Sequence, residues 1–290
     1  YADGTLVDGG SVSDPNFNRL VIKDLRMDVA EVLLYNRALT DTERQEVEAY
    51  LMSQVPAQAN QQTSSPGVDE TEMVCRLDLD ETDGATAGDS SPYGGDNTAT
   101  LQGDAAFLDG AVLLDGDGDY VDIPDSDAIN TADHALRSVS VRFKADDVAA
   151  AGKQLVYEEG DALRGLNIYL EGGLLHVGGW NSPESGWTGT WLTTDAVQSG
   201  TWHHVVLTLN GADTVQPDVF KAYLDGVEFG SGAGAKLWAH DGDTALGAVD
   251  GDTLFQDGAQ TGGGLAGAVD DLLIFNRVLS AQEVGDLATD

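Results

Sequence analysis

Two groups of acidic side chains have the residue types and spacing of a cation site. Asp89, Asp96 and Asn97 share one short polar stretch, and Asp270 and Asp271 are adjacent within an apolar stretch near the C-terminus. Calcium takes oxygen ligands from carboxylates, amide carbonyls and backbone carbonyls, often on an irregular loop. The alternative is that these Asp and Asn residues only hold turns through their own side chains.

A third acidic run, at residues 115–119, alternates Asp with Gly as the start of an EF-hand loop does. An EF-hand loop needs a Glu at its twelfth position, and Ser126 stands there instead. We therefore predict a hairpin turn for this run.

Three tryptophans, Trp180, Trp187 and Trp191, fall within a stretch rich in Gly and Ser, with Asn181 beside the first of them. Flat aromatic rings on a loop of a rigid scaffold are suited to packing against the apolar faces of sugars, while an amide takes the hydroxyl groups. Trp180, Asn181, Trp187 and Trp191 are therefore the predicted ligand-binding residues. The alternative is that the rings pack in the core or clasp a long hairpin.

The charge balance limits the possible partners. With 14 Lys and Arg against 50 Asp and Glu, the formal net charge of the 290 residues is −36. A surface so acidic has no basic stripe to neutralise phosphates, which argues against nucleic acid and anionic membranes as partners. The sequence also has no apolar run of the length that spans a bilayer, so we expect no membrane insertion.

The elements that position these residues have an all-β texture from residue 70 onward. Short apolar runs alternate with Gly, Asp and Asn turns, and the dipeptides at 210–211 and 225–226 are of the hairpin type. Helical signals follow only Thr40 and Ser280, where Glu43 and Glu283 stand at the spacing of a capping box.

The chain contains an internal repeat, because residues 29–40 line up with residues 269–280 at a constant offset. Each copy has an apolar strand, an Asn-Arg turn and a polar segment that opens a short helix. We therefore expect the C-terminal part of a first module at 1–53, a linker rich in Gln, Ser and Pro at 54–69, and a complete module at 70–290.

The second module resembles the laminin-G-like, or concanavalin A-like, family. The resemblance is carried by the opening strand at 75–81, the acidic loop at 89–97, a Leu-Asp-Gly and Asp-Tyr-Val pair at 114–121, the Gly-Thr-Trp-His-His-Val run at 200–205, the Tyr-Leu-Asp-Gly run at 223–226 and the closing strand at 267–280. It implies an all-β fold, a two-sheet antiparallel jelly-roll sandwich with a short helix after the last strand. It also implies an extracellular or cell-surface location. A structural calcium ion is implied too, held by Asp89, Asp96, Asn97 and Asp270, with Asp271 as a weaker fifth ligand.

The expected function is recognition without catalysis. Glucanases of this fold carry two Glu residues flanking an Asp along one strand, and that spacing is absent here, as are nucleophile-elbow, zinc-protease and phosphate-loop motifs. We expect a module that binds a glycan or glycoprotein. The alternative is a structural or adhesive module of a surface layer, filament or matrix that contacts other copies or other surface proteins.

Overall fold

The computed structural model describes residues 68–93, 95 and 97–289. These residues belong to one compact unit, Ser64–Asp290. The predicted first module at 1–53 and nearly all of the predicted linker at 54–69 lie outside the described residues, so these boundaries stay predictions.

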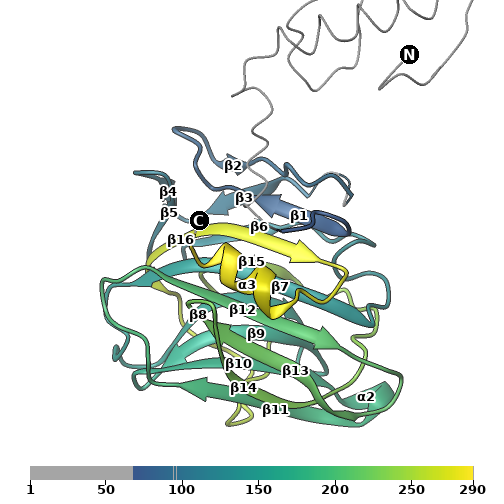
Figure 1. Cartoon of the computed structure of the whole chain (residues 1–290). Helices are drawn as coiled ribbons and strands as arrows, with labels where there is room; N and C mark the ends of the chain where they lie inside the picture. Colours follow the sequence, from purple (N-terminus) through teal and green to yellow (C-terminus); the bar gives the residue numbers. More distant parts are fainter. Residues whose placement is uncertain (1–67, 94, 96, 290) are drawn as a thin grey trace, which may run out of the picture. The chain divides into compact units, whose positions relative to one another are not determined.

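The described residues form two antiparallel sheets, as the sequence predicts (Figure 1). In the first sheet the strands lie in the order β14 (Val227–Gly234), β13 (Gln216–Leu224), β12 (His203–Asn210), β7 (Leu136–Ala145), β16 (Ala266–Phe275), β5 (Val112–Asp115) and β4 (Ala106–Phe107). Strand β1 (Met73–Leu77) pairs with the second half of β16, beyond the part that pairs with β5.

The second sheet has the order β11 (Trp187–Thr194), β10 (Leu174–Asn181), β9 (Arg164–Glu171), β8 (Lys153–Gly160), β15 (Thr244–Leu246), β6 (Tyr120–Ile123), β3 (Ala99–Gln102) and β2 (Thr86–Ala87). Strand neighbours that are far apart in sequence, such as β8 and β15, give the order a jelly-roll character rather than that of a simple meander.

The core lies between the sheets because successive strand residues point to opposite faces. Val139, Val141 and Phe143 of β7 are fully buried and belong to the same apolar cluster as Ile168 and Leu170 of β9. The predicted turn at 225–226 joins β13 to β14, and both Asp225 and Gly226 have positive φ, as a tight hairpin turn requires.

A buried ion pair joins the two sheets inside this core. Arg137 of β7 donates from Nη2 to Glu159 Oε1 of β8 at 3.1 Å, and the Tyr157 hydroxyl donates to Glu159 Oε2 at 2.8 Å. Burial alone would raise the pKa of Glu159, but the Arg137 guanidinium holds it at about 2. Both charged side chains are fully buried, so each depends on the other for its solvation.

Two short helices complete the described unit: α2 (Ser182–Ser185) and α3 (Ala281–Leu287). Helix α3, yellow in Figure 1, has the predicted capping box between Ser280 and Glu283, and its Val284 and Leu287 pack with Val206 on the outer side of the first sheet. Among the described residues, no helix is long and apolar enough to cross a membrane.

Candidate functional site

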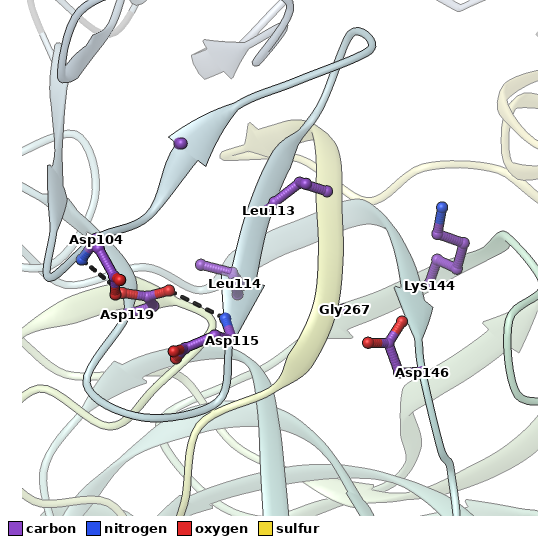
Figure 2. Close-up of a pocket in the computed structure, with 9 residues that line it drawn as sticks. Asp104, Leu113, Leu114, Asp115, Asp119, Lys144, Asp146 and Gly267 are labelled. Carbon is purple, nitrogen blue, oxygen red and sulfur yellow. Dashed lines mark hydrogen bonds between the residues drawn. The ribbon is translucent and has the colours of Figure 1, made fainter.

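An open hollow of about 430 Å³ lies at one end of the first sheet. Figure 2 shows Asp104, Asp115 and Asp119 facing one another on one side of it, and Lys144 and Asp146 on the other side, beyond the strand that carries Gly267. The hollow is therefore lined by charged side chains over an apolar floor, and its members come from five separate chain segments: Asp104, Ala106, Leu113, Leu114, Asp115, Asp119, Lys144, Asp146 and Gly267.

The strand register explains the floor. Leu113 of β5 pairs with Ala106 of β4 on one side and with Ala268 of β16 on the other, and Ala268 in turn pairs with Lys144 of β7. The small side chain of Ala268, between Leu113 and Lys144, leaves the sheet surface low at this point. The neighbouring Gly267 has a φ of +153°, and a Cβ there would strike the Lys144 carbonyl, so this approach of β16 to β7 needs glycine.

The three aspartates form a compact acidic group. Asp119 is 2% exposed, and its two carboxylate oxygens accept hydrogen bonds from the backbone amides of Asp104 (2.7 Å) and Asp115 (3.0 Å). Burial would raise the pKa of Asp119, but these amides lower it, whereas the hydrogen bond to Asp119 and its charge raise the pKa of Asp104. The segment at 115–119 is a turn between β5 and β6, but the prediction of a hairpin is wrong, because β5 belongs to the first sheet and β6 to the second.

The same group has the donors of a cation site. One ligand atom from each of Asp104, Asp115 and Asp119 lies within 4.8 Å of the others, and among the described residues no other group of three acidic, histidine or cysteine side chains meets this criterion. Carboxylate oxygens are a ligand type that calcium prefers. The donor set therefore fits a calcium ion.

Trp202 extends the hollow along the sheet surface. It directly precedes His203, which pairs with Phe143, so Trp202 lies beside Lys144, and the Lys144 Nζ is 5.2 Å from the centre of its ring. Trp202 is 39% exposed. A large aromatic face is thus open to solvent next to a hollow lined by carboxylates and an amine.

The predicted calcium ligands are not brought together. Asp89 accepts hydrogen bonds from the amide and the side chain of Asn97 (3.0 and 2.9 Å), and Asp89 pairs with Leu77 of β1. The opposite side of Leu77 pairs with Leu272 of β16, so strand β1 separates this loop from the closing strand. Asp96 lies outside the described residues.

Asp270 and Asp271 lie in β16, away from the Asp89 loop. Burial, and next the adjacent Asp271, raise the pKa of Asp270 to about 7, while Asp271 pairs with Arg142 Nε at 3.2 Å. The prediction of one site made from Asp89, Asn97, Asp270 and Asp271 does not match this arrangement, because the register of β1 keeps the two pairs on opposite sides of a strand.

The predicted ligand-binding tryptophans are largely covered. Trp180 is fully buried and donates its indole N–H to the Asp161 carbonyl, Asn181 is fully buried, and Trp187 is 2% exposed with its ring edge-on to Phe220. The prediction of an exposed platform is therefore wrong for these three residues. Trp191 is half-buried, and packs against the cluster of Leu155, Tyr169 and Phe255 on the outer side of the second sheet.

The residues of the hollow were missed because they are distant in sequence. Asp104 and Lys144 belong to no motif, and they meet Asp119 only through strand pairing. A signal was available for Trp202, since a Trp that follows a Gly-Thr pair and directly precedes a strand stands at the end of that strand.

A family model described as the concanavalin A-like lectin/glucanases superfamily matches residues 115–285. Solved structures with a similar fold include the ligand-binding domain of botulinum neurotoxin serotype D in complex with N-acetylneuraminic acid (TM-score 0.57, 13% identity, 78% of this chain and 52% of that chain). They also include domain 4 of an extracellular arabinanase from Geobacillus stearothermophilus in complex with arabinotriose (TM-score 0.51, 21% identity, 75% of this chain and 98% of that one).

The receptor-binding domain of a botulinum neurotoxin C/D mosaic serotype is similar at a TM-score of 0.55 and 14% identity, over 76% of this chain and 52% of that one. This chain thus spans about half the length of the neurotoxin domains that it matches. No curated protein sequence gives a significant match.

Proposed function

This chain belongs to the concanavalin A-like lectin/glucanase superfamily, and from that membership we propose that its described domain is a non-catalytic module that binds a glycan or glycoprotein outside the cell or at its surface. Two proteins of similar fold support the choice of ligand class, because one is in complex with N-acetylneuraminic acid and the other with arabinotriose.

The observation that carries the proposal is the exposed ring of Trp202 beside the acidic hollow. A sugar presents an apolar C–H face that packs on an indole ring and hydroxyl groups that donate to carboxylates. Trp202 supplies the ring, while Asp104, Asp115 and Asp146 supply acceptors and Lys144 a donor, all on the surface of one sheet. We place the saccharide across this surface, with Lys144 leaving the Trp202 ring as the sugar takes its place.

Calcium binding is part of the proposal. The ion would be held by Asp104, Asp115 and Asp119, whose carboxylates converge at the inner end of the hollow, instead of by the residues that the family resemblance implies. There it would neutralise the mutual repulsion of the three carboxylates and fix the turn between β5 and β6.

A glycan array probed with the purified chain tests the proposal, with calcium and with a chelator. We expect binding to one coherent class of saccharide, and a loss of at least about tenfold in affinity for Trp202→Ala, which corresponds to about 1.4 kcal/mol. Trp238→Ala is the matched control, because Trp238 is also partly exposed with Lys236 Nζ 3.8 Å above its ring, but it follows Leu237, which pairs with His134 beyond the far end of β7.

Two outcomes would contradict the proposal. Equal loss of binding in the Trp202 and Trp238 variants would show that the saccharide does not bind specifically at the hollow. Absence of binding to every saccharide by well-folded protein would favour the structural or adhesive module that contacts other proteins.

A further inference from the structure

The outer side of the second sheet carries a row of residues that strand pairing sets side by side. Their chain neighbours Val121, Ile168 and Val177 belong to the core, so the row itself points away from it. One residue comes from each of six adjacent strands: Asp122, Ala245, Glu158, Asn167, Gly178 and Trp191. The two small residues of the row are Ala245 and Gly178, and the space above Gly178 is taken up by the Asn167 amide and the Trp191 ring.

Two polar atoms in this row, Asn167 Oδ1 and Trp191 Nε1, are buried without a hydrogen-bond partner. They converge, because a Cβ on Gly178 would strike both Asn167 Oδ1, an acceptor, and Trp191 Nε1, a donor. Buried polar groups are almost always paired in folded proteins, so a donor and an acceptor left together call for a ligand group. A hydroxyl suits both, since it accepts from the indole and donates to the amide at once.

A single segment, residues 247–263 between β15 and β16, covers this row. The Asp250 amide donates to Glu158 Oε1, and Asn167 Nδ2 donates to the Leu254 carbonyl at 3.0 Å. Phe255 is fully buried, and its ring meets the Tyr169 ring edge-on at 4.7 Å and 80°. The aromatic side chain of the segment thus lies on an aromatic surface of the sheet, next to the unpaired atoms.

Between its two ends the segment forms no strand, so it can be described as a flap. Its ends are anchored to β8, because the Gly247 amide donates to the Val156 carbonyl and Gly263 bonds with Lys153 and Leu155. It folds on itself through hydrogen bonds from Thr253 to Gln260 and from Phe255 to Ala259, and its Asp257 pairs with Lys153 at 2.8 Å. Gly247 and Gly251 adopt positive φ near the start of the segment, and three glycines at 262–264 stand at its end. Gly251, Gly262 and Gly264 lie next to the anchored ends and give the segment the backbone freedom that a moving flap needs.

We propose that this row is a second saccharide-binding surface that the flap at 247–263 closes, with the Phe255 ring occupying the place of a sugar ring. The inference rests on the proposed carbohydrate binding and adds a second, gated surface on the other sheet. When the flap lifts, the sugar packs on Tyr169 and Trp191, and one of its hydroxyl groups joins Asn167 Oδ1 to Trp191 Nε1.

The test removes two aromatic rings from the same protein: Phe255, which fills the proposed second surface, and Trp202, on which binding at the hollow depends. In a Trp202→Ala background, Phe255→Ala should bind the saccharide identified on the array at least about tenfold more tightly than Trp202→Ala alone. Adding Asn167→Ala should abolish that gain. Gln260→Ala is the matched control, because Gln260 is exposed on the same flap and the variant keeps its backbone carbonyl, which accepts from the Thr253 amide, so affinity should be unchanged.

A measurement on the unaltered chain covers the case in which Phe255→Ala does not fold. In hydrogen exchange with excess saccharide, we expect the amide exchange of both 247–263 and the facing strands β9 and β10 to change. Exchange that changes only around Trp202, or a folded Phe255 variant with no gain in affinity, would overturn the gated surface while leaving the proposed function intact.

The two proposals fail in different ways. If neither the unaltered chain nor Phe255→Ala binds any saccharide, the proposed function and the gated surface both fall. An ordered water that joins Asn167 to Trp191 in a crystal of the Phe255 variant grown with the saccharide, with no sugar beside it, would also overturn the inference.

Discussion

Asp119 shows how one side chain can hold a turn and also belong to a cation site. Each of its oxygens accepts one backbone amide, and a carboxylate oxygen has a second lone pair to offer a metal ion. The interpretation of residues 115–119 as a turn therefore accounts for Asp119 without excluding calcium. What the sequence alone does not supply is Asp104, which reaches the group only after β3 and β6 have paired.

Calcium should stabilise the folded chain through this group. Millimolar calcium is expected to raise the melting temperature by several degrees, since a ligand at 100 times its Kd adds about 2.7 kcal/mol. Asp104→Asn should abolish that rise, because it removes one of the three carboxylates that converge on the ion. Asp117→Asn, an exposed change in the same turn, should keep it. An equal calcium response in both variants, measured by calorimetry, would contradict this placement.

His204 makes stability depend on pH. Burial, and then the charge of Arg142, lower the pKa of His204 to about 4, and one ring nitrogen lies 2.8 Å from the Ser140 hydroxyl. A folded-state pKa below the unfolded value of about 6.5 means that the unfolded chain binds the proton more tightly. The contribution of His204 to stability is therefore complete above pH 6.5, and is lost as the pH falls toward 4.

Replacing His204 by Gln tests this dependence. Between pH 7.5 and pH 4.5, the unaltered chain should lose up to about 3 kcal/mol more of its free energy of unfolding than the variant does. Denaturant titrations at the two pH values measure it. A difference between the two proteins that is the same at both pH values would show that His204 does not titrate as described.

At the scale of the element, the tryptophan-rich stretch is a strand pair rather than a loop. Strand β10 ends at Asn181, α2 follows, and β11 starts at Trp187. Gly178 and Gly179 lie inside β10 because a Cβ at either position would strike the ring of Trp191 or Trp187. The glycines therefore make room for indole rings, and their number misled the prediction of an exposed loop.

The contact between β7 of the first sheet and β8 of the second depends on the buried Arg137–Glu159 ion pair. Arg137→Met should destabilise the fold by about 3–5 kcal/mol, because it leaves the Glu159 carboxylate buried and unpaired. Combining it with Glu159→Gln should recover part of that loss, since no buried charge then remains. Equilibrium unfolding in denaturant measures both, and a double variant no more stable than Arg137→Met would contradict this account of the pair.

At the scale of the whole molecule, local sequence patterns were sufficient to predict the fold. The alternation of apolar and polar residues, the hairpin turn at 225–226 and the capping box at Ser280 each depend on a few neighbouring residues, and each is present in the structure. The location of the hollow and of the flap depends instead on strand register between distant segments. The exposed position of Trp202 and the buried position of Phe255 under the flap could therefore be found only from the strand pairing in the structure.

The central claim is that the chain binds carbohydrate at Trp202, and the indole N–H resonances of its five tryptophans test it most directly. During titration with the saccharide found on the array, the resonance of Trp202 should shift most, and that of the fully buried Trp180 should stay in place. Shifts that leave Trp202 unchanged, or no shift in any of the five, would contradict the claim.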